Sequence, residues 1–412
     1  MLPTKNEKIN YLFIILFNFA TNLNSVVRYL LFCLFVIFVA CSKTKAPINN
    51  PIIEIDGSEK SLIPVIWDSI LSEFFVLKLE TPQGVFLGSI QKVVFSRNRI
   101  FISDTKMMNS VFIFDQFGQY INHLEGGFKG PGEFINPKSI TVDFEKDELY
   151  VLDDKLQKII HFNSMGQFID EFKFIYTSCD ISKIEDGIFA YNSGYPQIDN
   201  NVNSNDLLYS SNNGKILKKF LPLRNWRKAS FFNKENAFTE YQDTTWYSPV
   251  YNDTIYYLKR TGPIPVYRIY MGNKFINDEI AGKINLDDPS REYIHAVGTF
   301  QKTKGTIYFS YSVRERESGR SVSRHLFFDL HSFNVKSSEF FASHGISTGL
   351  FQPPIATNGE YFVSAIEAFD AKRAIEWRIN QGIELTEERM ELFLNLSESD
   401  NPLLMFYKVA PF

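Results

Sequence analysis

Hydrophobic and polar residues alternate over short stretches of this chain, which is the pattern of strands with one buried face. The stretch SITVDF, Ser139–Phe144, alternates in this way and is rich in β-branched residues. Two longer segments, Ile100–Ile121 and Leu149–Ile169, share one order of features. Each has a short strand that ends in aspartate, a turn, a second strand, and then a glycine turn followed by Gln-aromatic-Ile. The pattern therefore predicts repeated strand–turn–strand units.

The spacing of the turn glycines indicates a long repeat. A weaker copy of the same unit occupies Ile188–Leu217, and Gly118, Gly166 and Gly214 are 48 residues apart each time. A period of this size, built from strand pairs, is typical of β-propeller blades, which are four-stranded antiparallel sheets that cover one another's faces around an axis. The composition agrees, because the 40 Phe and 20 Tyr suit strands with packed aromatic faces.

Further strand pairs near residues 251, 305 and 361 bring the count to six blades, with seven as the alternative. The segment Phe74–Pro82 is predicted to be a strand that completes the last blade and closes the ring. The aspartates that end the repeated strands, Asp104 and Asp153, are expected to accept backbone hydrogen bonds at the turns. We therefore predict an all-β fold, a six-bladed β-propeller of four-stranded antiparallel blades.

The strand pattern is interrupted near the C-terminus. Residues 370–396 have helical features, in which Gly382 ends a first helix and Thr386, followed by two glutamates, begins a second. We predict a short helical insertion in the last blade, either as a partner-docking element or as a cover for blade edges. The propeller domain is expected to span residues 61–412.

The first forty residues have the composition of a secretory signal. Lys5, Lys8 and Arg28 precede the apolar run Tyr29–Ala40, which is short for a membrane span, and Cys41 follows directly. This order predicts a lipoprotein-type signal peptide over residues 1–40, a lipid on Cys41 and a tether over residues 41–60. A second apolar block, residues 11–20, leaves two alternatives open: an overlong gene start, or an uncleaved anchor.

Charge and cysteine content limit the classes of function. Residues 1–40 hold three basic residues and one acidic residue, which leaves 40 basic against 46 acidic in the remainder. A mildly acidic chain argues against a nucleic-acid partner. Because Cys33 lies in the signal and Cys41 takes the lipid, Cys179 is left alone and is predicted to be a small buried residue.

The glycine-rich stretch GGFKGPGEF, Gly126–Phe134, raises the question of a phosphate site. Gly127 and Gly132 have P-loop spacing, but Glu133 follows where lysine belongs, and the next segment is a strand where a helix would be needed. We interpret the stretch as the crossover from the outer strand of one blade to the inner strand of the next. On that face Lys129 and Glu133 are candidates to line a ligand site, with turn bonding as the alternative for Glu133.

Several segments together resemble a known family. The stretches VFLGSIQKVVFSRNRIFISD, FKGPGEF, VYNDTIYYL and SESDNPLLMFYK are similar to six-bladed β-propeller lipoproteins of Bacteroidota, NHL-like and TolB-like in architecture. The family's usual G-x-G-P-G-E-aromatic loop is matched at Gly130–Phe134. The resemblance implies the propeller fold and an envelope location, and it implies no particular activity.

A second candidate ligand region is Leu223–Pro249, which holds two of the four tryptophans beside arginines. Such a mixture suits a rim that stacks sugars or holds a partner, and packing between blades is the alternative. The candidate residues there are Arg224, Trp226, Arg227 and Trp246.

No motif for enzymatic chemistry is found in the sequence. The six histidines are scattered, and zinc spacing, a calcium loop and a G-x-S-x-G elbow are missing, so no metal, cofactor or catalytic residue is predicted. We predict an envelope lipoprotein, most simply on the periplasmic face of the outer membrane, with surface exposure as the alternative. Its partners would be the membrane, through the lipid, and a glycan, peptide or envelope protein. The alternative function is a propeller-type hydrolase or lyase acting on glycans or peptides, and a sensor role in nutrient uptake is a third.

Overall fold

The computed structural model describes most of the chain after residue 51. The described ranges are 52–58, 65–66, 70–176, 178–192, 205–223, 234, 236–250, 252–272, 275, 293–314, 321–338, 341–342, 352–382 and 387–412. Residues Ile52–Phe412 form one compact unit.

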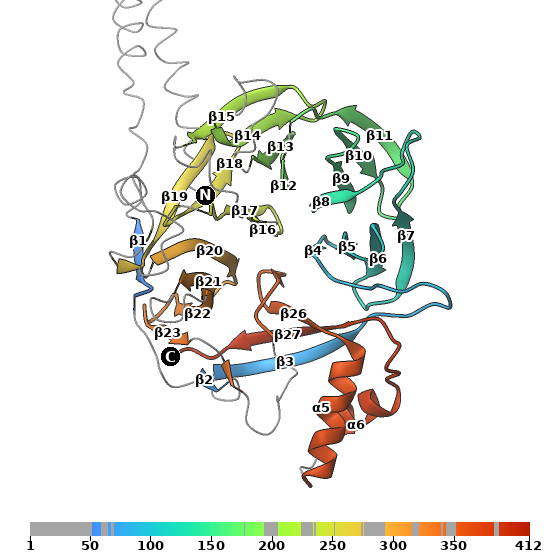
Figure 1. Cartoon of the computed structure of the whole chain (residues 1–412), viewed down its shortest axis with the longest axis vertical. Coiled ribbons are helices and arrows are strands. Elements are labelled where there is room, and N and C mark those ends of the chain that lie inside the picture. Colours follow the sequence, from blue (N-terminus) through green and yellow to red (C-terminus); the bar gives the residue numbers. More distant parts are fainter. Residues whose placement is uncertain are drawn as a thin grey trace, which may run out of the picture. The chain divides into compact units, whose positions relative to one another are not determined.

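Six antiparallel sheets are arranged in a ring, each with its first strand near the axis and its last strand outside (Figure 1). Blade 1 contains β4 (Lys92–Phe95), β5 (Arg99–Asp104), β6 (Ser110–Asp115) and β7 (Tyr120–Glu125). Blade 2 contains β8 (Pro137–Asp143), β9 (Glu148–Asp153), β10 (Lys158–Phe162) and β11 (Phe168–Lys173). Blade 3 contains β12 (Asp180–Ile184), β13 (Gly187–Tyr191), β14 (Asn205–Ser211) and β15 (Ile216–Pro222).

The remaining blades follow the same order. Blade 4 contains β16 (Phe238–Tyr241), β17 (Thr244–Tyr247), β18 (Thr254–Lys259) and β19 (Gly262–Tyr270). Blade 5 contains β20 (Tyr293–Lys302), β21 (Thr306–Arg314), β22 (Ser321–Asp329) and β23 (Val335–Ser338). Blade 6 contains β25 (Ala356–Thr357), β26 (Phe362–Ile366), β27 (Leu403–Val409) and, from the other end of the chain, β3 (Leu71–Lys78). The prediction of six four-stranded blades is confirmed.

The ring is closed by two segments far apart in the sequence. Strand β3 is antiparallel to β27, with Phe75 opposite Phe406 and Leu77 opposite Leu404. The prediction that the segment around Phe74–Pro82 completes the last blade is therefore confirmed. Its strand begins three residues earlier and ends before the threonine-proline pair.

Two further strands come from the region expected to be a tether or its surroundings. Strand β1 (Ile53–Asp56) pairs in parallel with β19 and adds a fifth strand to blade 4, with Ile55 fully buried. A short parallel pair joins β2 (Val65–Ile66) to β24 (Phe341–Ala342). The structured part thus begins before residue 61, because the open edge of β19 accepts another strand.

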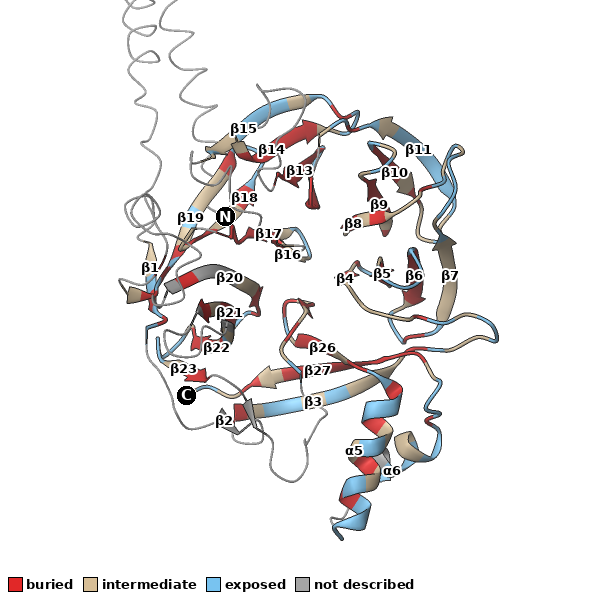
Figure 2. Cartoon of the chain, in the orientation of Figure 1, coloured by how far each residue is buried: buried red, intermediate tan, exposed pale blue. Residues whose placement is uncertain are grey.

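Hydrophobic clusters of the described residues occupy all six interfaces between neighbouring blades. Between blades 1 and 2, for example, Phe101 and Ile113 pack against Val151 and Ile160. The middle strands are mostly buried, whereas the outer strands β7, β11 and β15 are largely partly buried or exposed (Figure 2). Cys179 is buried between blades 3 and 4, as predicted for a small core residue.

The repeated aspartates join two turns each. In blade 1, Asp104 accepts hydrogen bonds at 2.9 Å from the backbone N–H groups of Gly88 and Ser89, which lead into the blade, and from that of Met107. Asp153 does the same in blade 2, with Ile135 at 2.6 Å and Lys155 at 2.8 Å. The predicted role in turn bonding is confirmed, and it explains why the aspartate occurs at the same place in blades 1 and 2.

The helical insertion lies between β26 and β27, on the outside of blade 6 (Figure 1). Helix α5 (Ala368–Asn380) is followed by Gly382 at φ +68°, and α6 (Glu387–Leu394) comes next. A positive φ is easily adopted by glycine, which accounts for the end of the first helix at this position. Among the described residues, no helix has the length and apolar character required to cross a membrane.

Candidate functional site

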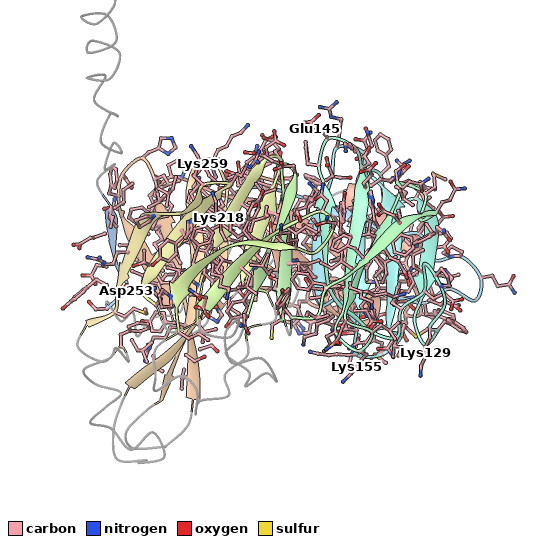
Figure 3. The ribbon with its side chains drawn as sticks, turned by 90° about the horizontal axis from the view of Figure 1, so that it is seen from above. Lys129, Glu145, Lys155, Lys218, Asp253 and Lys259 are labelled. Carbon is pink, nitrogen blue, oxygen red and sulfur yellow. The ribbon has the colours of Figure 1, made fainter. Side chains whose placement is uncertain are left out.

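The ring has two faces with different kinds of turns. The hairpin face holds the turns between the first and second strands of each blade, and the connection face holds the links from one blade to the next. Figure 3 shows Glu145, in the β8–β9 turn, on one face, with Lys129 and Lys155 on the opposite face.

A pocket of about 310 Å³ opens on the hairpin face. It is formed by residues of blades 1, 2, 4 and 6, and its volume is at the lower end of the range for small-ligand sites. Its lining includes the buried residues Ile100 and Phe406. Tyr241 of blade 4 and Asn358 of blade 6 also line the pocket.

One wall of the pocket is a layer of aromatic rings. The rings of Phe75 and Phe406 are stacked, with centroids 4.7 Å apart and planes 5° apart. Phe95 meets the edge of Phe406 at 5.8 Å. Because Phe75 is 38% exposed, this layer presents an apolar aromatic surface to the pocket. Such a surface can stack against a flat or apolar group.

The β4–β5 turn contributes two arginines. Arg97 forms an ion pair with Glu145 on blade 2, and both side chains are about half exposed. Arg99 donates from Nε to the carbonyl oxygen of Ser164 at 3.2 Å and from Nη1 to that of Asn98 at 3.0 Å. The two guanidinium groups are the charged groups among the residues that line the pocket.

The turn that holds these arginines is fixed to blade 2 by Asp147. Its carboxylate accepts hydrogen bonds from the Ser96 hydroxyl at 2.6 Å and from the Asn98 amide at 2.7 Å. Burial alone would raise the pKa of Asp147, but these hydrogen bonds, that from the Asn98 N–H and the nearby charge of Arg99 outweigh it and hold that pKa below its ordinary value. Asp147 therefore stays ionised and keeps the turn in place.

The axis of the ring is filled by a buried polar cluster. Lys92 of blade 1 forms an ion pair with Asp180 of blade 3 at 2.7 Å, and their side chains are 8% and 0% exposed. Asp180 also accepts hydrogen bonds from the Ser139 hydroxyl of blade 2 and from the N–H groups of Ala237 and Phe238, at the start of blade 4. Both oxygens of this carboxylate accept hydrogen bonds, so it is a structural group.

A second axial carboxylate, Glu240, lies on β16. It accepts a hydrogen bond from Thr141 at 2.7 Å. Burial raises the pKa of Glu240 above its ordinary value, and the charge of Lys92 offsets only part of this rise. The space beside it measures about 10 Å³, which is the size of a single water. Carboxylates thus converge on the axis: Asp180 is enclosed by protein, whereas Glu240 is partly buried beside this small space.

The GGFKGPGEF loop joins β7 to β8, which confirms the predicted crossover. Lys129 and Glu133 are both exposed on the connection face, away from the pocket. Glu133 accepts a hydrogen bond from the N–H of Gly130 at 2.6 Å, which is the turn-bonding alternative. Contact of these two residues with a ligand stays a prediction.

Trp246 lies in the core between blades 4 and 5 and is 7% exposed. Its ring packs against Tyr267 at 5.5 Å and Phe300 at 6.3 Å, as the packing alternative expected. Arg224, Trp226 and Arg227 lie outside the described residues, as does Cys41. Within the described residues, no group of three His, Cys, Asp or Glu side chains is arranged to hold a metal ion.

The pocket residues were not predicted from the sequence. The stretch VVFSRNRIF, Val93–Phe101, carries the same mixture of arginines and aromatics that singled out Leu223–Pro249. That mixture, placed at a hairpin tip between two strands, is the signal that could have found Arg97 and Arg99.

Six four-stranded antiparallel blades around one axis define the protein as a six-bladed β-propeller. A family model described as "Domain of unknown function (DUF4934)" matches residues 50–408, and the chain belongs to that family. No match was found among curated proteins.

Solved structures that are similar to this chain come from several bacteria. A protein of Bacteroides fragilis NCTC 9343, described as exported, has 16% identity and a TM-score of 0.67, covering 87% of this chain and 100% of its own. A DUF4221 member from Bacteroides vulgatus ATCC 8482 has 10% identity and a TM-score of 0.45, with coverages of 83% and 98%. BamB from Moraxella catarrhalis has 9% identity and a TM-score of 0.39, with coverages of 64% and 78%. At 16% identity, the likeness to the B. fragilis structure shows the fold alone.

Proposed function

We propose that this protein is an envelope lipoprotein whose propeller binds a ligand in the pocket on its hairpin face. The propeller would be NHL-like or TolB-like, attached through a lipid on Cys41 to the periplasmic face of the outer membrane. Support for export comes from the signal-like residues 1–40 and from the similar B. fragilis structure, which is described as exported.

The pocket is the observation that carries the binding function. Four blades contribute to it, and the ion pair and hydrogen bonds between blades 1 and 2 hold its rim in place. A preformed concave site that combines an aromatic wall with polar side chains can bind a ligand at low cost, because little order has to be gained on binding.

The alternative function, a hydrolase or lyase, has weaker support. It would require a carboxylate that reaches a substrate, and the axial candidate Asp180 is fully buried and bonded to donors from several blades. Glu240 faces a space for a single water. Binding without chemistry is therefore the function that this geometry favours.

The test is a thermal-shift screen of the full chain, extracted from a bacterial envelope with detergent, against glycans, peptides and divalent metals. A ligand present at a hundred times its Kd stabilises the native state by about 2.7 kcal/mol. A hit whose shift is lost in Phe75→Ala and kept in Phe128→Ala would support the pocket. Phe128, 51% exposed, is a matched control because it follows β7 in the GGFKGPGEF loop.

Two results would contradict the proposal. If the shift were lost in Phe128→Ala and kept in Phe75→Ala, the ligand would bind on the connection face, near Lys129 and Glu133. If no compound of any class gave a shift, small-ligand binding would be wrong, and a protein partner would become the leading candidate.

A further inference from the structure

The charge of the pocket is unbalanced. Its lining includes Arg97 and Arg99 and no acidic residue. Arg99 donates to two backbone carbonyl oxygens, and its charge also acts on the Asp147 carboxylate, which bonds to the β4–β5 turn and is not among the lining residues. Arg97 is paired with Glu145 just outside the lining, and because both side chains are about half exposed this ion pair is weak. The pocket therefore presents positive charge to whatever enters it.

A ligand that fills such a pocket removes water from the guanidinium groups. A neutral ligand would leave their charge less well solvated, whereas an anion replaces the lost water with charge-assisted hydrogen bonds. The planar guanidinium fork of arginine matches a carboxylate in shape, and two donors can bind its two oxygens together. Charge therefore favours an anionic ligand.

The aromatic layer restricts the rest of the ligand. Phe75 is stacked on Phe406, and Phe95 contacts the edge of Phe406. The wall beside the arginines is therefore formed by aromatic rings and is apolar. A flat apolar group placed on this wall gains contact area and excludes water, and a small hydrophilic anion gains neither.

We propose that the pocket binds a small aromatic carboxylate, with its ring on the Phe75 wall and its carboxylate on Arg97. This inference rests on the proposed function and names the class of ligand at the same site. In binding, the ligand carboxylate takes the place of Glu145 as the partner of Arg97. Removing the charge of Glu145 therefore strengthens binding, while removing that of Arg97 weakens it.

The test uses three probes on the full chain in detergent, measured by calorimetry. N-acetyl-L-phenylalanine has the ring and the carboxylate, its amide lacks the charge, and N-acetylglycine lacks the ring. The expected result is that the acid binds about tenfold more tightly than the amide, in keeping with a charge-assisted hydrogen bond. It should also bind about tenfold more tightly than N-acetylglycine, which loses the apolar contact of the ring.

Three variants assign the charge effect to the pocket. Arg97→Gln should reduce the acid-over-amide preference to less than about threefold, and Glu145→Gln should tighten acid binding by a similar factor. Arg260→Gln is the matched control, because Arg260 also forms a half-exposed ion pair, with Asp186 at 3.2 Å, and it is not among the residues that line the pocket. It should leave the preference unchanged.

The two proposals fail in different ways. If the amide binds as tightly as the acid and both are lost in Phe75→Ala, the pocket is a binding site and the anionic class is wrong. The inference is also wrong if Arg260→Gln lowers the preference as much as Arg97→Gln. Failure of all three probes to bind at millimolar concentration would overturn it too, while the ligand screen would still decide the proposed function.

Discussion

Lys302 shows how the core of this protein holds a charged group. It is 8% exposed, at the end of β20, and its ammonium nitrogen lies 5.4 Å from the centre of the Trp246 ring. It also donates a hydrogen bond to the carbonyl oxygen of Thr303 at 3.0 Å. Burial lowers the pKa of Lys302 to about 8, because the charged form loses its water. Trp246, for which the sequence left a ligand contact and packing between blades as alternatives, lies beside this lysine in the core.

This pKa predicts a pH dependence of stability. In the unfolded chain lysine has a pKa near 10.5, so between pH 8 and that value the unfolded state binds more protons than the folded state. Stability should therefore rise with pH, by about 1 to 2 kcal/mol from pH 8 to pH 9.5 for one such group. In Lys302→Met, the rise in the free energy of unfolding from pH 8 to pH 9.5 should be smaller by that amount, as measured by urea unfolding at each pH. Lys259→Met, at an exposed turn, should keep the wild-type slope, and equal slopes for all three proteins would show that Lys302 is not the cause.

At the scale of the elements, the repeated glycine has a role that its spacing alone did not reveal. Gly118 is at φ +80° in the β6–β7 turn, a conformation that glycine adopts without strain. A Cβ atom at this position would also lie 2.4 Å from the carbonyl oxygen of Lys78, on the outer strand of the preceding blade. Gly214 makes the same approach to Lys173, at 2.2 Å. The turn glycine therefore allows neighbouring outer strands to approach each other.

The cost of the positive φ and the cost of the close approach between strands can be separated by comparing two glycines. Gly84 has the same φ of +80° but has no atom within 4 Å of a Cβ placed on it. Gly84→Ala should therefore cost only the backbone strain, about 1 kcal/mol. Gly118→Ala should cost about 1 to 3 kcal/mol more, because the methyl group would push two blades apart. Equal losses in the free energy of unfolding would mean that the close approach is unimportant.

At the scale of the whole molecule, the ring is closed both at its perimeter and at its axis. Strand β3 joins the two ends of the chain through its pairing with β27. At the axis, Asp180 receives hydrogen bonds from donors of blades 1, 2 and 4 while belonging to blade 3. A single buried carboxylate thus connects four blades, and the ion pair with Lys92 neutralises its charge.

Replacing this carboxylate should destabilise the whole ring. Asp180→Asn would leave the ammonium group of Lys92 buried without its counter-charge, and breaking a buried ion pair in this way costs about 3 to 5 kcal/mol. Asp186→Asn, which removes one partner of an exposed ion pair, should cost less than about 1 kcal/mol. Chemical denaturation of both variants measures the difference. A loss for Asp180→Asn as small as that of the control would show that the axial cluster does not hold the blades together.

Much of the fold could be predicted because it depends on local pattern. Alternation within the strands, the turn glycines Gly118, Gly166 and Gly214 at a spacing of 48 residues, and the aspartate that ends the second strand of blades 1 and 2 identify the repeat without any knowledge of contacts. The addition of β1 to blade 4 was not predicted, because it depends on the open edge of β19, which exists only when that blade has formed. The candidate site was predicted poorly for the same reason. Tryptophan is a residue type that is common in binding sites. The position of Trp246 in blade 4, however, places its side chain in the core.

The sequence by itself determined the class of this protein: repeated strand pairs, six blades, a closing strand from the N-terminal side and a helical insertion in the last blade. These features follow from neighbours in the chain, whose backbone preferences and side-chain faces act over a few residues. Only the tertiary structure decided which side chains meet. Phe75, Arg97, Tyr241 and Phe406 form one pocket, and Lys92 and Asp180 one ion pair, because ring closure brings together blades that are far apart in the sequence. Whether a charged or aromatic side chain is buried or available to a ligand depends on that closure, and so the set of side chains that share the pocket could be found only in the folded molecule.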